Sequence, residues 1–178
     1  MARPHDIPDD SDEKWQYTEH AAAKHEILRR YLDAWLAILG RRRKGSTFRH
    51  SQLVLVDGFA GRGRYVNGQP GSPVIMFERA VQAVEAGQAE NVLIRCAEPN
   101  KTNFKHLEEV CAGLNHDRVR IAPRCQTFAE IGSALGDWVE KQSPAIPTFV
   151  MVDPYGVRGV ELPLFFVGCL ATTGLRCF

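Results

Sequence analysis

The sequence lacks the features that mark several large classes of protein. Its five cysteines form no Cys-x-x-Cys pair and no Cys/His cluster with the spacing of a zinc site, so we expect buried free thiols. The longest apolar stretch, Leu162 to Ala171, is interrupted by Pro163 and Gly168 and is far shorter than a membrane span. The N-terminus is polar and acidic and has no apolar core of a signal peptide. We therefore expect a cytoplasmic protein with no membrane contact and no metal.

A strong overall charge is also missing. With 22 Lys and Arg residues against 21 Asp and Glu, the formal net charge at pH 7 is +1, so the protein as a whole does not attract a polyanion. The basic residues are nevertheless unevenly distributed, with a run at 41–44, then Arg49, and then Arg62 and Arg64 after an apolar segment. We expect the run at 41–44, with Arg62 and Arg64, to bind nucleic-acid phosphates. The alternative for the run at 41–44 is that it complements the negative end of a preceding helix.

Length and composition are those of one globular domain. The chain has 178 residues, of which 44% are hydrophobic and 24% charged, and this is enough for a sizeable core. Residues 1–14 hold two prolines and five acids without apolar periodicity, so we expect a mobile N-terminal arm there. The single domain then occupies residues 15–178.

Helical and strand patterns alternate through this domain. Apolar residues at three-and-four spacing predict a helix over 18–40, with Thr18 as its N-cap. Ser72 is the expected N-cap of a later helix, and Thr127 with Glu130 forms a capping box for another. Four apolar runs predict strands near residues 53–57, 92–97, 119–122 and 148–152. This alternation predicts an α/β, Rossmann-like parallel sheet with helices on both faces.

The stretch at 53–63, LVLVDGFAGRG, points most directly to a ligand. Glycines after a buried strand let main-chain N–H groups face a cofactor. The dinucleotide pattern GxGxxG fails at Val66, and no GxxxxGK[ST] phosphate loop occurs. What remains is Asp57-x-Phe59-x-Gly61-x-Gly63. This spacing resembles the first motif of S-adenosylmethionine-dependent amino-methyltransferases; the alternative is a turn that binds nothing.

Acidic residues follow three of the four predicted strands. They are Asp57, Glu98 and Asp153. Because the carboxyl ends of parallel strands meet at one edge of a sheet, we expect these side chains to lie close together. Glu98 suits a grip on ribose hydroxyls, as in other nucleoside-binding sheets. The alternative for Glu98 is an exposed acid without a special role.

Four short motifs carry a family resemblance. They are Lys24-His25 with Leu28, Tyr31-Leu32 and Trp35; DGFAGRGRY at 57–65; Gly-Ser-Pro at 71–73; and Asp-Pro-Tyr-Gly at 153–156. Their combination, over about Trp15 to Val160, resembles the bacterial three-Cys-motif partner family and is also similar to ribosomal-RNA adenine-N6 methyltransferases. The resemblance implies a methyltransferase-type sheet and S-adenosyl-L-methionine as the cofactor.

The resemblance also implies catalytic roles. In the amino-methyltransferase pattern, Asp-Pro-Pro-aromatic follows the fourth strand and orients the amino group that is methylated. By this likeness, the Asp153 carboxylate and the Pro154 carbonyl would accept hydrogen bonds from that amino group, and Tyr155 would stack on the base. This chain departs from the pattern in having one proline before the aromatic residue, and in the long loop at 64–71.

A set of cofactor contacts follows from the same likeness. Asp57 and the backbone of Gly61 and Gly63 would hold the methionine end, and Glu98 the ribose. Phe59 of the same motif is a further candidate. Either Gln126 or Thr127 would contact the adenine edge, and Lys24 and His25 would close over the cofactor.

Three functions fit these residues. The first is methylation of adenine N6 in RNA or DNA. The second is a non-catalytic cofactor-binding module that works with a partner protein encoded nearby, as the family name suggests. The third is a generic nucleotide binder.

The end of the sequence is shorter than the resemblance leads us to expect. Only 22 residues follow Gly156, whereas similar sheets carry further parallel strands, each with a crossover of about a dozen residues or more. We therefore expect a truncated member of a longer family that is weakly stable and inactive as a methyltransferase by itself.

Overall fold

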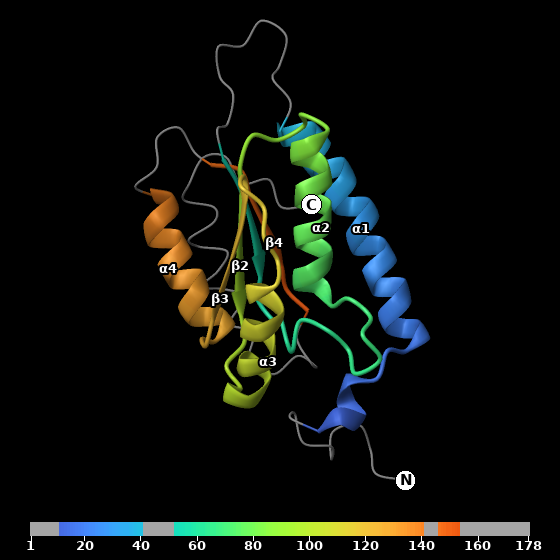
Figure 1. Ribbon diagram of the computed structural model, residues 1–178. Coiled ribbons are helices and arrows are strands. Elements are labelled where there is room, and N and C mark those ends of the chain that lie inside the picture. The colour runs from blue at the N-terminus through green and yellow to red at the C-terminus, as the bar shows by residue number, and fades with distance from the viewer. Residues whose placement is uncertain (1–10, 41–51, 141–145, 154–178) are drawn as a thin grey trace, which may run out of the picture.

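The described chain forms a four-stranded parallel sheet covered by helices (Figure 1). The computed structural model describes residues 11–40, 52–140 and 146–153. Its strands are β1 Leu53–Asp57, β2 Val92–Ala97, β3 Val119–Arg124 and β4 Thr148–Met151. Its helices are the 3-10 helix η1 Asp12–Trp15 and the α-helices α1 Glu19–Gly40, α2 Ser72–Glu85, α3 Lys101–Ala112 and α4 Phe128–Glu140. The predicted α/β class with a Rossmann-like parallel sheet is confirmed.

The strand order is β3-β2-β1-β4. From β1 the chain moves outward through α2 to β2 and through α3 to β3, and it then returns through α4 to β4 on the other side of β1. The direction of winding thus reverses at β1. In open parallel sheets, ligands bind beyond the carboxyl ends of the strands at such a reversal. This edge contains the predicted site.

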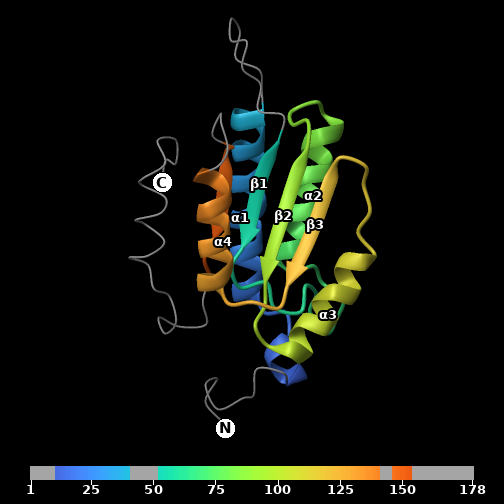
Figure 2. The same ribbon diagram turned by 90° about the vertical axis from the view of Figure 1, so that its left-hand side faces the viewer.

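Alternate residues of β1 enter two separate cores. Leu53 and Leu55 belong to the larger core with α1, α2 and α3, whereas Val54 and Val56 belong to a smaller core with α4. All four are at most 1% exposed, as expected for a parallel strand that is buried on both faces. Figure 2 shows α4 on one face of the sheet and α2 on the other. Because side chains alternate along a strand, Asp57 faces the same side as Leu53 and Leu55.

Aromatic packing positions α1 against β4. The rings of Tyr31 and Trp35 lie 5.4 and 5.9 Å from the ring of Phe149 in β4. Ring pairs at these centroid distances make favourable contacts in addition to their buried area. This packing brings the N-terminal half of α1, with Lys24 and His25, to the carboxyl end of β4.

Two predicted helix starts are present. The Thr18 hydroxyl accepts a backbone N–H three residues into α1 at 3.2 Å. The capping box also forms: the Thr127 N–H donates to the Glu130 carboxylate at 2.7 Å, and the Glu130 N–H donates to the Thr127 hydroxyl at 3.3 Å. These side chains satisfy backbone donors that have no partner inside the helix.

The prediction for Ser72 is wrong. Gly71 occupies the N-cap of α2 without a side-chain cap, and Ser72 is the first helical residue. Two strand ends also differ from their predicted positions, since β3 continues to Arg124 and β4 ends at Met151. These differences do not alter the strand order.

The first described residues differ from the expected mobile arm. Residues 12–15 form η1, which the Ser11 hydroxyl caps by accepting a backbone N–H at 3.3 Å. Trp15 is only 9% exposed, and its carbonyl accepts the Val66 N–H at 3.0 Å. Residues 11–14 therefore belong to the folded domain, whereas residues 1–10 lie outside the described part. Figures 1 and 2 show η1 at the end toward which the strands point.

The cysteines follow the expectation only in part. Cys96 and Cys111 are buried free thiols, but Cys125 is exposed. Burial raises the pKa of Cys111 to about 12 and also raises that of Cys96, so both thiols are unreactive at neutral pH. The other two cysteines lie outside the described residues.

Candidate functional site

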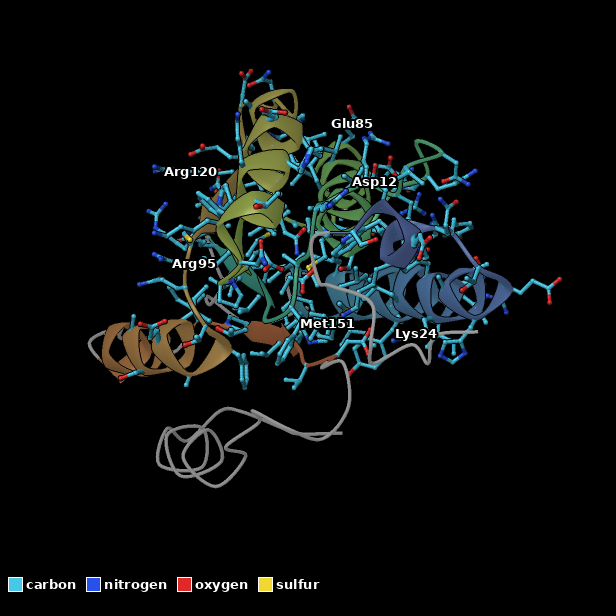
Figure 3. All side chains as sticks on the ribbon, turned by 90° about the horizontal axis from the view of Figure 1, so that it is seen from below. Asp12, Lys24, Glu85, Arg95, Arg120 and Met151 are labelled. Carbon is cyan, nitrogen blue, oxygen red and sulfur yellow. The ribbon has the colours of Figure 1, made fainter. Side chains whose placement is uncertain are left out.

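Three carboxylates lie near one another at the carboxyl edge of the sheet. Asp57 pairs in register with Cys96 of β2 and Met151 of β4, so Glu98 and Asp153 each follow two residues after a partner of Asp57. Burial raises the pKa of Asp57, and the charges of Asp153 and Glu98 raise it further, which places the three groups within electrostatic reach. Figure 3 looks onto this edge, with Met151 and Lys24 labelled.

Asp57 is the most deeply buried acid of this set. Its side chain is 0% exposed, and Oδ1 accepts the Phe59 N–H at 3.1 Å. Oδ2 accepts no hydrogen bond of standard geometry from the described residues, although the Ser72 side chain is near enough to stabilise the charge. Burial, with the two neighbouring acids, raises the pKa to about 6 against these stabilising contacts. Asp57 therefore presents a buried oxygen with unused capacity to accept hydrogen bonds.

Glu98 is fixed by the turn that joins β2 to α3. Its Oε1 accepts the Asn100 N–H at 2.8 Å, and its own N–H donates to the Arg124 carbonyl at 3.1 Å. Asn100 in turn caps α3, accepting two backbone N–H groups at 2.9 and 3.1 Å. The carboxylate is thus held at the sheet edge by the same contacts that start the helix.

Asp153 is paired with a residue that sequence reasoning placed beside the cofactor. Lys24 of α1 forms an ion pair with Asp153, and the two side chains are 44% and 41% exposed. The structure thus joins two candidates that are separated by most of the chain. The other two catalytic candidates, Pro154 and Tyr155, lie outside the described residues.

His25 lies in an aromatic cluster rather than at the surface. Its ring is 5.7 Å from Tyr17 and 5.6 Å from Tyr65, and its side chain is buried. Burial, with smaller contributions from the charges of Arg29 and Lys24, lowers its pKa to about 4 against the opposing charge of Asp153. Nδ1 has no hydrogen-bond partner among the described residues. The imidazole is therefore neutral at pH 7.

The glycine loop has the backbone that its sequence predicts. Gly61 and Gly63 have φ of 59° and 77°, in the region that favours glycine. A Cβ at Gly61 would overlap the indole of Trp15, and one at Gly63 would come within 3.1 Å of Leu107 and 3.2 Å of Val110. The two glycines thus allow η1 and α3 to pack closely against the loop.

Two other candidates are already engaged by packing or capping. Phe59 stacks on Phe128 of α4, with ring centroids 5.6 Å apart. The Thr127 hydroxyl is used in the capping box, which leaves Gln126 as the more available of the pair after β3. Gln126 is half-buried.

The burial and the partners of Arg62 contradict its predicted role as a phosphate ligand. Its side chain is buried, with Nε donating to the Asn103 Oδ1 at 2.9 Å and Nη1 pairing with Asp12 at 2.5 Å. Its guanidinium also lies 5.6 Å from the centroid of the Trp15 ring. Arg62, in the glycine loop, therefore links this loop to η1 through Asp12 and to α3 through Asn103. Sequence reasoning missed this contact, for which the available signal was Trp15, a large aromatic residue directly after the polar arm.

Of the other basic candidates, the structure describes only Arg64. Arg64 donates to the Gly68 carbonyl at 3.0 Å within its own turn. The run at 41–44 and Arg49 lie outside the described residues.

Replacing Arg62 should show how much these links stabilise the domain. We expect Arg62→Met to lower the free energy of unfolding by about 2 kcal/mol, because buried Asn103 loses a charged donor. Urea denaturation followed by tryptophan fluorescence is the measurement. Arg64→Met is the matched control and should change stability by less than about 0.5 kcal/mol. Equal losses in both variants would contradict the role given to Arg62.

The three acids form a site of negative charge suited to cations and hydroxyl groups. Within the described residues, no group of three His, Cys, Asp or Glu side chains is arranged to hold a metal ion.

No family model and no curated protein matches the chain. None of the described helices has the length and apolarity needed to cross a bilayer.

Proposed function

We propose that this chain is a methyltransferase-type domain of the three-Cys-motif partner family that binds S-adenosyl-L-methionine and, contrary to the inactivity expected from its sequence, methylates adenine N6 of nucleic acid. The observation that carries the proposal is the burial of the Asp57 carboxylate at the sheet edge. Its buried carboxylate lies where the winding of the sheet reverses, and Oδ2 has unused acceptor capacity. A buried carboxylate is unfavourable unless donors or a cation compensate for it.

The acids fit the polar groups of S-adenosylmethionine. Its methionine end carries an ammonium group, which would supply Asp57 with both a donor and a compensating charge. Glu98, at the end of the neighbouring strand, suits the ribose hydroxyls, and Gln126 at the end of β3 suits the adenine edge. When bound, the cofactor supplies an electrophilic methyl group on a sulfonium.

Asp153 is placed to act on the substrate. At the end of β4, its carboxylate would accept a hydrogen bond from the target amino group, and Lys24 orients it through the ion pair. Pro154 and Tyr155 complete the amino-group site by resemblance. Methyl transfer would form a nitrogen–carbon bond, break the carbon–sulfur bond of the cofactor to leave its neutral thioether product, and release one proton from the amino nitrogen to water; these residues would orient the nitrogen for that step.

The same ion pair favours a second candidate. With Lys24 already bound to Asp153, the edge also suits a non-catalytic module that binds the cofactor and acts through a partner protein. A generic nucleotide binder would use the same acids. The three candidates differ in which ligand binds and whether a methyl product forms.

Isothermal titration tests the cofactor site. We expect S-adenosylmethionine or its demethylated product to bind with Kd below about 1 mM, which corresponds to about 4 kcal/mol. Glu98→Gln should weaken binding about tenfold, because it replaces a charged acceptor by a neutral one. Glu108→Gln on the exposed face of α3 makes the same charge change and should leave Kd unaltered. No heat of binding at a cofactor concentration of about 1 mM would reject the proposal, and so would tighter binding of a simple nucleotide than of S-adenosylmethionine.

A further inference from the structure

Three arginines gather on the sheet at its β3 edge. They are Arg95 in β2 and Arg120 and Arg124 in β3. Arg95 pairs in register with Ala122, which is two residues from each of the other two arginines. Since side chains two apart on a strand share a face, all three lie on one face of the sheet.

This face is the one that α4 covers in part. Leu93 and Ala97, two residues before and after Arg95, belong to the core beneath α4. β3 is an edge strand of the described sheet, and Arg120 and Arg124 are exposed beside that core, with Arg95 half-buried. Figure 3 shows the labelled Arg95 and Arg120 on the same side of the molecule, with α3 beside them and α4 below them.

The positive charge of these arginines is not neutralised by the described residues. None of the three forms an ion pair with a described carboxylate, although Arg124 donates to the Pro123 carbonyl at 3.0 Å. Burial lowers the pKa of Arg95, and the charges of Arg124 and Arg120 lower it as well, as expected of like charges that lie close together. Like charges on neighbouring strands are destabilising, and a bound anion would remove that repulsion.

We infer that Arg95, Arg120 and Arg124 form a binding surface for the phosphates of a single-stranded nucleic acid. The planar guanidinium matches a phosphate through two parallel hydrogen bonds. Arg120 and Arg124 are four residues apart, which is about 13 Å along an extended strand, so the surface is long enough for more than one phosphate. An extended polyanion fits this line better than a single small anion.

The surface leads directly to the acidic edge. Arg124 ends β3, and its carbonyl accepts the Glu98 N–H at 3.1 Å. A backbone held on the arginines would thus reach the edge beside β3, three strand spacings or about 14 Å from Asp153, and would cross the edge past the cofactor contacts to bring a base there. A base in a single strand can reach the edge without being extruded from a duplex. The inference deepens the proposed function and rests on it for the class of substrate.

Fluorescence anisotropy with a labelled single-stranded RNA of about 16 nucleotides tests the surface without cofactor. The triple variant Arg95→Gln/Arg120→Gln/Arg124→Gln should weaken binding at least tenfold. It should also reduce the slope of log K against log salt by about 2, because each phosphate contact contributes about 0.7. Its melting temperature should be unchanged or higher, since repulsion is relieved.

A second triple variant separates the surface from net charge. Arg30→Gln/Lys101→Gln/Lys105→Gln removes the same charge from exposed positions on α1 and α3 and should keep most of the affinity and the slope. Equal losses in both triple variants would overturn the inference, as would polyglutamate binding as tightly as RNA through the same arginines, which would indicate an acidic protein partner.

Cofactor titration keeps this result distinct from the proposed function. The arginine variant should bind S-adenosylmethionine with the Kd of the unmodified protein. Arginine-dependent RNA binding without any cofactor heat would reject the proposed function and leave the surface standing. Cofactor binding with RNA affinity insensitive to the three arginines would reject the surface alone.

Discussion

Replacing Asp153 by asparagine is expected to lower the rate of methyl transfer to a nucleic-acid amino group on the order of 10²–10³-fold. A positioned polar group that acts on the reacting atoms commonly contributes this much. The asparagine keeps the size of the side chain but loses the charged acceptor, and its own NH₂ group repels the donor hydrogens of the substrate. Transfer of a labelled methyl group to an oligonucleotide under single-turnover conditions is the measurement.

The cofactor affinity separates this effect from a general loss of structure. Asp153 follows β4, whereas the proposed cofactor contacts Asp57 and Glu98 belong to β1 and the turn after β2, so Asp153→Asn should bind S-adenosylmethionine within a few-fold of the unmodified protein. Asp117→Asn, an exposed acid before β3, is the matched control and should transfer methyl groups normally. If the unmodified protein binds the cofactor and forms no methyl product, the non-catalytic module becomes the better account.

The parts of the fold that sequence predicts are those with local signals. The run at 53–57 is buried on both faces and carries no polar residue before Asp57, so its pattern alone indicates a central parallel strand. Thr127 and Glu130 lie at the spacing of a capping box, and their bonds form as that spacing requires. Ser72 has the residue type of an N-cap, but the turn shifts the helix start by one residue, which no local pattern reveals.

The residues of the candidate site likewise include some that local sequence signals predict and some that they do not. Asp57, Glu98 and Asp153 were predictable because parallel strands bring their carboxyl ends to one edge whatever the loops do. The burial of Arg62 depends on contacts with Asp12 and Asn103, which are distant in sequence and share no motif.

The arginine surface was likewise hidden in the sequence. Arg95 and Arg120 lie near each other on one face of the sheet only because β2 and β3 pair in one particular register. A shift of one residue would turn Arg120 and Arg124 to the opposite face of the sheet. Contacts set by register and by packing therefore needed the structure.

Asp57 and His25 are expected to give stability opposite dependences on pH. Burial, with nearby charges, raises the pKa of Asp57 from 3.8 to about 6 and lowers that of His25 from 6.5 to about 4. Native Asp57 binds its proton more tightly than in the unfolded chain, so its contribution to the free energy of unfolding falls as pH rises from about 4 to about 6. Native His25 binds its proton less tightly, so its contribution rises between about pH 4 and about pH 6.5. The two trends mask each other in the unmodified protein.

Single variants should separate the two groups in urea denaturation at several pH values. Relative to the unmodified protein, Asp57→Asn should gain on the order of 2 kcal/mol of stability between about pH 4 and about pH 7, because only the unmodified chain must bury an ionised carboxylate. His25→Gln should change in the opposite direction, gaining relative stability as the pH falls. S-adenosylmethionine should reduce the advantage of Asp57→Asn at neutral pH, since an ammonium beside Asp57 compensates its charge. Parallel pH profiles for all three proteins would mean that neither group is buried in the form described, and the case for a cation at Asp57 would fail with it.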